Sequence, residues 1–312
     1  SIQQGKYQRK ESQFRHWVTA KGETGFKAEA GRYHLYVSLA CPWAHRTTIF
    51  RALKGLVPLI SMSVVHPDMF GQGWTFEHDD DSKALYGTTG DTLNNFTLMR
   101  EAYAQSDASY QGNITVPVLW DKQQQCIVNN ESADIIRMFN SAFDGITGIA
   151  QDFYPKALRA QIDEVNAFVY HNINNGVYKT GFATTQAAHE QSSMALFAAL
   201  DRLEQRLSKQ RYLVGEQITE ADWRLFTTLV RFDAVYHTHF KCNIQLIKEY
   251  DALYGYLLDL YQQGGIAETI NMAHIKRHYY NSHRSFNPYG IVPLGHRQDW
   301  TVAHHRAAIS AS

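Results

Sequence analysis

The sequence predicts an α/β domain followed by an all-α domain, and the hydrophobic patterning of its two halves supports this prediction. In the first half, segments of alternating or apolar residues and two helical patterns follow in the order strand, helix, strand, insertion, strand, strand, helix. From Tyr154 to about Ala273, apolar residues recur only at helical spacing. With 312 residues, the chain is long enough for two packed domains.

The α/β pattern occupies residues 33–150, after an N-terminal extension over residues 1–32. "RYHLYVS" alternates and predicts a strand, and Cys41 then begins a helical pattern. "LISMSVV" predicts a second strand, which is followed by a long insertion of about residues 66–112. An insertion of that length is usually functional or partly helical. "ITVPVLWD" and "CIVN" predict two more strands, and "NESADIIRMFN" predicts the closing helix.

An all-helical domain is predicted over residues 154–275. Thr219 and Asp222 stand at the spacing of a capping box before an apolar stripe, with Asp in the place of the commoner Glu or Gln. The remaining residues, 276–312, form a tail rich in His and Tyr. Two apolar runs at helical spacing support the domain: Leu158, Ile162, Val165 and Val169, and Leu196, Leu200, Leu203 and Leu207.

Charge and composition argue against several classes of protein. The 30 basic and 30 acidic side chains cancel, so no polybasic surface for a nucleic acid is expected. No apolar run approaches the roughly 18 residues of a membrane helix, and the first residues contain no apolar signal core. Three cysteines form a poor disulfide framework for a chain of this length. We therefore expect a cytoplasmic protein with reduced thiols and with no membrane or nucleic-acid partner.

Cys41, in "SLACPWAHR", is the first candidate for chemistry. A cysteine reacts as its thiolate, and a helix N-terminus lowers the pKa of a thiol. Pro42 suits the first helical position, because the amide hydrogen that it lacks would be unpaired there. A lone cysteine is often only a small buried apolar residue, but a Cys-Pro pair at a strand-to-helix junction favours a nucleophile. Ala44 stands where a dithiol motif would carry a second cysteine, so the resolving thiol must come from another molecule.

Two further stretches suit a peptide-like ligand. Val116 precedes Pro117, and a cis bond there would offer the Val116 backbone to an extended peptide by strand addition. The alternative is an ordinary proline at a sheet edge. Glu131 and Ser132 open a helix, whose unpaired N–H groups attract a carboxylate while Glu131 attracts an ammonium group. The pair suits the zwitterionic head of an amino acid, and it is also a common helix cap.

The Cys-Pro motif, the segment before Pro117 and the helix start at Glu131, in this order along the chain, resemble the glutathione-transferase fold. This fold is an α/β thioredoxin-like N-terminal domain plus an all-α C-terminal domain. One subgroup is the most similar, the glutathionyl-hydroquinone reductases or Xi-class glutathione transferases. The similarity runs from about Lys6 to Gly290. The motifs that carry it are "RYHLYVSLACPWAHRT", "GWTF", "GDTL", "TVPVLWD", "NESADIIRMFN", "NNGVYKTGFAT", "FTTLVRFDAVYHTHFKCN" and "GIAETINMAHIKRHYYNSH".

The resemblance implies glutathione as co-substrate, glutathionylated aromatic small molecules as further partners, no metal, and a homodimer. Cys41 would be the nucleophile, and Tyr178 would exchange a proton beside the aromatic substrate. Tyr236 and Tyr279 would line a second pocket, to which the tail 276–312 contributes, and would help to stabilise the thiolate. The residues expected to contact glutathione are Trp74, Asn113, Ile114, Thr115, Val116, Glu131 and Ser132.

The implied reaction removes glutathione from a glutathionyl-hydroquinone. The Cys41 thiolate attacks the glutathione sulfur, which gives a mixed disulfide and frees the hydroquinone, and a second glutathione then releases oxidised glutathione. One alternative is a monothiol transferase of the Omega type that reduces glutathione mixed disulfides or dehydroascorbate. A third hypothesis is a non-catalytic module with the same fold that serves protein interaction.

Other motifs are interpreted as ordinary structure. His237 and His239 have no clear partner ligands and predict no metal site. "GTTGDT" lacks the lysine of a phosphate-binding loop. The acidic run "EHDDD" in the insertion is interpreted as a solvated loop, and Cys126 and Cys242 as structural residues.

Overall fold

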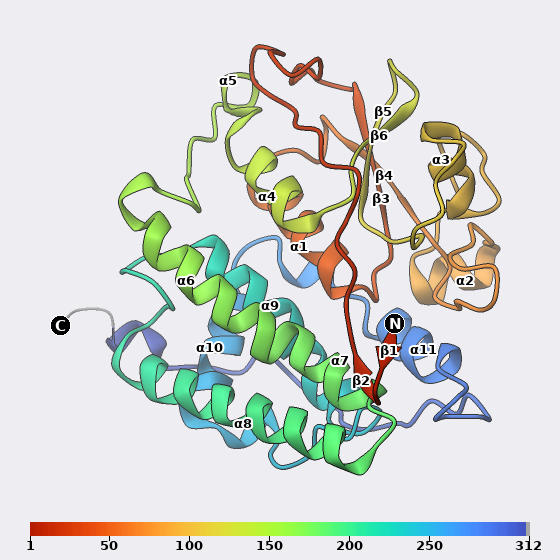
Figure 1. Ribbon diagram of the computed structural model, residues 1–312. Coiled ribbons are helices and arrows are strands. Elements are labelled where there is room, and N and C mark those ends of the chain that lie inside the picture. Colours follow the sequence, from red (N-terminus) through yellow and green to blue (C-terminus); the bar gives the residue numbers. More distant parts are fainter. Residues whose placement is uncertain (310–312) are drawn as a thin grey trace. The chain divides into compact units, whose positions relative to one another are not determined.

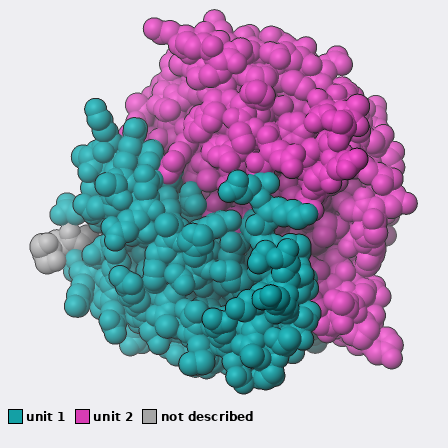
Figure 2. Space-filling model, viewed as in Figure 1, with its two compact units in different colours: residues 1–11, 153–267, 293–312 teal, residues 12–152, 268–292 magenta. Residues whose placement is uncertain are grey.

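The computed structural model describes residues 1–309, and the chain divides into two compact units, which Figure 2 colours separately. The sheet unit comprises Ser12–Asp152 and Glu268–Val292. The helical unit comprises Ser1–Glu11, Phe153–Ala267 and Pro293–Ser312, of which residues 310–312 lie outside the described part of the chain. The last three residues of the predicted tail therefore have no structural description here.

The sheet unit is built on a four-stranded mixed sheet with the strand order β4-β3-β5-β6 (Figure 1). The buried strand β3 (Tyr33–Val37) pairs in parallel with β4 (Ser61–Val64) and antiparallel with β5 (Val118–Asp121). Strand β6 (Cys126–Asn129) completes the sheet antiparallel to β5. A parallel pair needs a crossover, which α1 (Pro42–Leu53) supplies between β3 and β4. The predicted order of strands and helices and the thioredoxin-like fold class are confirmed.

The sheet unit also contains a pair of helices that pack against each other and two helices within the insertion. Helix α4 (Ser132–Ser141) packs against α1. The insertion holds α2 (Asp80–Tyr86) and α3 (Met99–Ser106), and α3 packs on β6. Short helix α5 (Asp144–Thr147) follows α4. The long insertion is therefore partly helical.

The acidic run of the insertion begins a helix. Asp79 is the N-cap of α2 and forms a capping box with Ser82, while Asp80 and Asp81 occupy the first turn. Negative side chains are favourable there because the helix macrodipole is positive at its N-terminus. The run is exposed, as the interpretation of a solvated loop requires, but only Glu77, His78 and Asp79 lie outside a helix. Asp80 and Asp81 belong to α2, so for them the interpretation as a loop is wrong.

The sheet unit includes two segments that the predicted α/β domain, residues 33–150, does not contain. Residues 12–32, expected in a separate extension, join the sheet unit. The reason is a set of specific bonds: the Arg15 guanidinium pairs with the Asp134 carboxylate of α4, and the His16 N–H donates to the Val128 carbonyl oxygen at 3.0 Å. Helix α11 (Met272–Ser282) also belongs to the sheet unit, although it follows the helical region in sequence.

The helical unit contains long helices interrupted by two π-helical turns. Figure 1 shows these helices from green to blue. Its main elements are α6 (Arg159–Val169), the π-helix η2 (Tyr170–Asn174), α7 (Asn175–Phe182), α8 (Gln186–Lys209), α9 (Glu220–Arg231), the π-helix η3 (Phe232–Tyr236) and α10 (Asp251–Tyr261). The short elements are β1 (Ile2–Gln3), β2 (Lys6–Tyr7), η1 (Lys156–Leu158), η4 (Ile247–Glu249), η5 (Ala267–Thr269) and η6 (Arg306–Ile309).

The predicted capping box at Thr219 and Asp222 is confirmed at the start of α9. The buried Asp222 carboxylate accepts hydrogen bonds from the N–H groups of Thr219 and Leu213, each at 2.9 Å, and from the Tyr256 hydroxyl at 2.7 Å. It therefore joins the loop before α9 to α10 as well as capping α9.

The C-terminal tail is fixed to the helical unit by Arg306. Its guanidinium donates to the carbonyl oxygens of Leu207, Gln210 and Arg211 at 2.7, 2.9 and 2.8 Å. These groups lie at or just past the end of α8, where carbonyls lack partners within the helix.

Within residues 1–309, no helix combines the length and the apolar character that a membrane crossing requires.

Candidate active site

Cys41 is the N-cap residue of α1. Its backbone is extended, with φ −71° and ψ 119°, and Pro42 occupies the first helical turn. The Cys41 Sγ accepts a hydrogen bond from the Ala44 N–H at 3.4 Å, and the residue is 8% exposed. Since the helix macrodipole is positive at this end, the position favours a thiolate. The thiol also donates to the Val116 carbonyl oxygen at 3.4 Å, which favours the neutral form.

Val116, the last residue of the segment 113–116, lies beside this sulfur, and the Val116–Pro117 peptide bond is cis. The Val116 N–H makes no hydrogen bond to any described residue, so it remains available to a ligand backbone. Asn113 is exposed, and its carbonyl oxygen accepts from the Tyr110 hydroxyl at 2.6 Å. Ile114 is half-buried. The segment thus keeps one backbone donor without a partner among the described residues, the Val116 N–H, in the residue whose carbonyl oxygen contacts the Cys41 sulfur.

Tyr103, in α3, supports this segment and was not predicted. Its hydroxyl donates to the Thr115 carbonyl oxygen at 2.6 Å and accepts from the Thr115 N–H at 3.2 Å. The Asn130 side chain also donates to that hydroxyl, at 3.2 Å, immediately before Glu131. Burial raises the pKa of Tyr103 to about 12, so its hydroxyl stays protonated at neutral pH. Nothing in the sequence separates Tyr103 from the other tyrosines.

Glu131 and Ser132 form the N-terminus of α4, with Glu131 as its N-cap. The Glu131 N–H donates to the Asn129 side chain at 2.7 Å, and the Glu131 carboxylate accepts from the Ser12 hydroxyl at 2.9 Å. The Ser132 hydroxyl accepts from Arg46 at 3.3 Å. A carboxylate beside the unpaired N–H groups of a helix can bind both the ammonium and the carboxylate of one amino acid. The contact from Ser12 was not predicted because its segment was assigned to an extension.

Trp74 and Tyr279 also lie in the sheet unit with Cys41. The Trp74 ring stacks on the His278 ring of α11, with 4.8 Å between centroids and 27° between planes. Tyr279 follows in the same helix and is buried, with its ring 5.0 Å from that of His278. Helix α11 therefore contains one predicted site residue, Tyr279, and contacts another, Trp74, through His278.

Tyr178 and Tyr236 lie in the helical unit, where they belong to an aromatic cluster. Their ring centroids are 6.0 Å apart, and the Tyr178 ring stacks at 6.0 Å on Tyr7 from β2. The Tyr236 ring stacks at 5.2 Å on Phe240. Tyr236 ends the π-helix η3, and Tyr178 lies in the helix that follows η2; single π-turns are frequent at functional sites.

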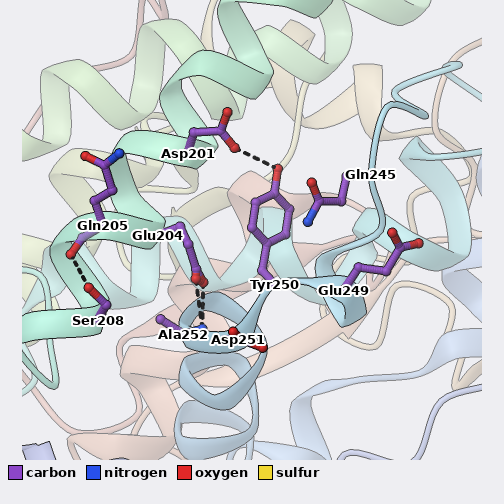
Figure 3. A pocket seen from close by; sticks show the side chains of 9 residues that line it. All are labelled: Asp201, Glu204, Gln205, Ser208, Gln245, Glu249, Tyr250, Asp251 and Ala252. Carbon is purple, nitrogen blue, oxygen red and sulfur yellow. Dashed lines mark hydrogen bonds between the residues drawn. The ribbon is translucent and has the colours of Figure 1, made fainter.

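A separate pocket of about 430 Å³ lies in the helical unit, and it contains none of the predicted site residues (Figure 3). Several of its polar groups have local partners. The Glu204 carboxylate accepts from the N–H groups of Ala252 and Leu253 at the start of α10, and the Tyr250 hydroxyl donates to Asp201 at 3.4 Å. The Glu204 contacts satisfy N–H groups in the first turn of α10. The described residues contain no group of three or more potential metal ligands.

The other two cysteines lie in different surroundings from Cys41. Cys126 is half-buried in β6, and burial raises the pKa of its thiol. Cys242 is fully buried, which also raises the pKa of its thiol. Neither is at a helix N-terminus, so both stay protonated at neutral pH. No disulfide is present in the described part of the chain.

Two family models match the chain. Residues 40–142 match the glutathione S-transferase N-terminal domain, and residues 186–258 match the glutathione S-transferase C-terminal domain. Among curated proteins, the chain is 55% identical to glutathionyl-hydroquinone reductase YqjG of Escherichia coli (strain K12), over 97% of this chain and 92% of YqjG.

Solved structures give the same result. The glutathione-bound structure of YqjG from Escherichia coli K-12 matches with a TM-score of 0.92 and 54% identity, over 95% of this chain and 96% of that one. The Xi-class glutathione transferase from Natrialba magadii matches with a TM-score of 0.91 and 47% identity, over 95% of this chain and 89% of that one. The chain therefore belongs to the glutathione transferases, and within them to the Xi class that includes glutathionyl-hydroquinone reductases.

Proposed function

We propose that this chain is a glutathionyl-hydroquinone reductase that acts through a mixed disulfide between Cys41 and glutathione. The observation that carries the proposal is the position of Cys41. Its sulfur caps α1 and accepts from the Ala44 N–H, and Ala44 occupies the place of a second cysteine. The N-terminus of α1 favours a thiolate there, while the contact of the thiol with the Val116 carbonyl oxygen opposes ionisation. The disulfide that the thiolate forms would be resolved by a thiol from another molecule.

The chemistry balances with two glutathione groups. Protonation of the ring carbon that bears sulfur converts the glutathionyl-hydroquinone into a keto tautomer. The Cys41 thiolate then attacks the glutathione sulfur, the carbon–sulfur bond breaks, and its electron pair enters the ring as a phenolate that is protonated to hydroquinone. A second glutathione thiolate attacks the mixed disulfide, which regenerates the Cys41 thiolate and releases oxidised glutathione.

The three tyrosines are proposed to serve the aromatic substrate. Tyr178 would give the ring carbon its proton, because an ordinary tyrosine titrates near 10 and is a proton donor at neutral pH. Tyr236 and Tyr279 would line the pocket of the hydroquinone and stabilise the thiolate. The aromatic cluster around Tyr178 and Tyr236 supports an aromatic ligand in preference to an aliphatic one.

Glutathione is proposed to bind along the sheet unit. The Val116 backbone would pair with its cysteinyl residue, and Glu131 and Ser132 would hold its γ-glutamyl head. Trp74 and residues 113–115 would contact the rest of the peptide. The unbonded Val116 N–H and the position of Glu131 at the start of α4 support this arrangement.

Replacing Glu131 tests the site of the γ-glutamyl head. We expect Glu131→Gln to raise the KM for glutathione roughly 10- to 100-fold, because a charge-assisted hydrogen bond to an ammonium group is lost. The turnover number at saturating glutathione should change little, since the reacting sulfur is not touched. Steady-state kinetics on glutathione, with Glu101→Gln in α3 as the control, measure both values. An unchanged KM would exclude Glu131 from the binding site.

A direct assay separates this function from its alternative, a monothiol reductase of the Omega type. The protein is mixed with glutathionylated hydroquinone and glutathione, and free hydroquinone is followed by chromatography. The proposal predicts release of hydroquinone and one oxidised glutathione for each turnover. A protein that releases none, but reduces a glutathione mixed disulfide quickly, has the alternative function. A protein that binds glutathione and turns over neither substrate is an interaction module.

We also propose a homodimer in the cytoplasm. Light scattering on the purified protein tests the homodimer, and a monomer at micromolar concentration would contradict it. Fractionation of the source cells tests the location.

A further inference from the structure

His274 connects three segments of the sheet unit. It lies in the first turn of α11 and is fully buried. Its Nδ1 lies 2.9 Å from the carbonyl oxygen of Tyr86, the last residue of α2, and its Nε2 lies 3.3 Å from the Ser38 hydroxyl. The Ser38 hydroxyl in turn accepts from the Ala40 N–H at 3.1 Å. Ala40 is the residue before Cys41.

The chemistry of these groups gives the hydrogen bonds one direction. A carbonyl oxygen only accepts, so His274 Nδ1 must carry the hydrogen that it donates to Tyr86. In a neutral ring, Nε2 is then an acceptor and takes the hydrogen of the Ser38 hydroxyl. The Ser38 oxygen keeps a lone pair for the Ala40 N–H. Each member of the chain therefore orients the next, from α2 to the backbone at Ala40.

We propose that His274 is a positioning residue for the nucleophile. The residues from Ser38 to Ala40 lead from β3 into α1, outside either element. By holding Ser38, His274 fixes the Ala40 backbone so that the Cys41 sulfur faces the N-terminus of α1. This inference rests on the proposed role of Cys41, and it adds residues that the reaction itself does not touch.

Helix α11 has other attachments to the sheet unit, which separate this role from general anchoring. The Arg277 guanidinium pairs with the Asp68 carboxylate at 2.8 and 3.1 Å, and the Ser282 hydroxyl accepts from the Met69 N–H at 3.0 Å. These bonds do not involve His274 or the loop before Cys41. Loss of the Ser38 contact therefore leaves α11 held in place.

Two amide variants separate the two hydrogen bonds of His274. Gln places an oxygen near the position of Nε2, so His274→Gln keeps an acceptor for Ser38. Asn places its amide near the position of Nδ1, so His274→Asn keeps the bond to Tyr86 and loses Ser38. Ser38→Ala removes the middle of the chain by another route. Arg277→Ala is the control, because Arg277 attaches α11 to Asp68 and has no hydrogen bond to His274 or Ser38.

The measurements are the rate of alkylation of Cys41 by iodoacetamide and the steady-state kinetics on glutathionylated hydroquinone. We expect His274→Asn and Ser38→Ala each to slow alkylation and turnover roughly tenfold, with the KM for glutathione unchanged, because a small misplacement of a reacting atom is costly. The double variant should show the same loss as each single variant, since both break one chain. His274→Gln should keep the rates of the unmodified protein, and Arg277→Ala should lower only the melting temperature.

Two results would overturn the inference. The first is full alkylation and turnover in both His274→Asn and Ser38→Ala, while Cys41→Ser is inactive; the proposed function would then stand without His274. The second is an equal loss of turnover in His274→Asn, His274→Gln and Arg277→Ala, which would show that His274 acts only by attaching α11. An active Cys41→Ser variant would overturn the proposed function itself, and with it this inference.

Discussion

Cys41→Ser is expected to lower the release of hydroquinone by at least about a thousandfold, because a serine hydroxyl in this position is not ionised at neutral pH and forms no disulfide. The fold should remain intact, since serine is a good N-cap residue and still accepts from the Ala44 N–H. The measurement is hydroquinone release by chromatography, with the melting temperature as the check on folding.

Cys126→Ser is the matched control for this variant. Cys126 is a half-buried thiol in the same sheet unit, and burial raises its pKa. We expect its replacement to leave turnover within about twofold of the unmodified protein, because it lies away from any helix N-terminus. Equal losses in the two variants would mean that Cys41 is not the nucleophile.

Asp222→Ala is expected to cause the largest loss of stability of any single change considered. It leaves the buried N–H groups of Leu213 and Thr219 and the Tyr256 hydroxyl without their acceptor. Each such group costs about 1–3 kcal/mol when it stays buried without a partner, so the free energy of unfolding should fall by roughly 3 kcal/mol or more.

Chemical denaturation followed by circular dichroism measures this loss. The control is Glu190→Ala, an exposed carboxylate on α8, which should change the free energy of unfolding by less than about 0.5 kcal/mol. A change of that small size in Asp222→Ala would contradict the assignment of Asp222 as the residue that joins α9, its preceding loop and α10.

The sequence predicts well the features that depend on local patterning. Alternation of apolar residues identified β3 and β4, and the Cys-Pro pair identified the start of α1. The spacing of Thr219 and Asp222 identified the start of α9. These signals are local, because the residues that produce them lie within one or two turns of one another.

Features that depend on long-range contacts could not be predicted in this way. The segment containing Ser12 and Arg15 joins the sheet unit through Glu131 and Asp134, more than a hundred residues away. Tyr103 supports the segment before Pro117 from within an insertion that carries no regular pattern. The placement of these residues follows from tertiary packing, for which a single sequence gives no periodic signal.

The acidic run at Asp79–Asp81 shows that composition alone does not predict local structure. Its composition is typical of a solvated loop, but the same residues are favourable at a helix N-terminus. The acidic composition of the run does not show that Asp79 and Ser82 cap each other and start a helix. Ser82 stands where the usual capping-box signature has Glu or Gln, so a search for that signature would not have found α2.

Trapping the covalent intermediate tests the central claim most directly. The reduced protein is mixed with glutathionylated hydroquinone in the absence of glutathione, quenched with acid, digested and analysed by mass spectrometry. The account predicts one glutathione bound by a disulfide to the peptide that contains Cys41, one equivalent of released hydroquinone, and loss of the adduct when glutathione is added. Release of hydroquinone in repeated turnovers without any adduct on Cys41, or an adduct only on Cys126 or Cys242, would contradict it.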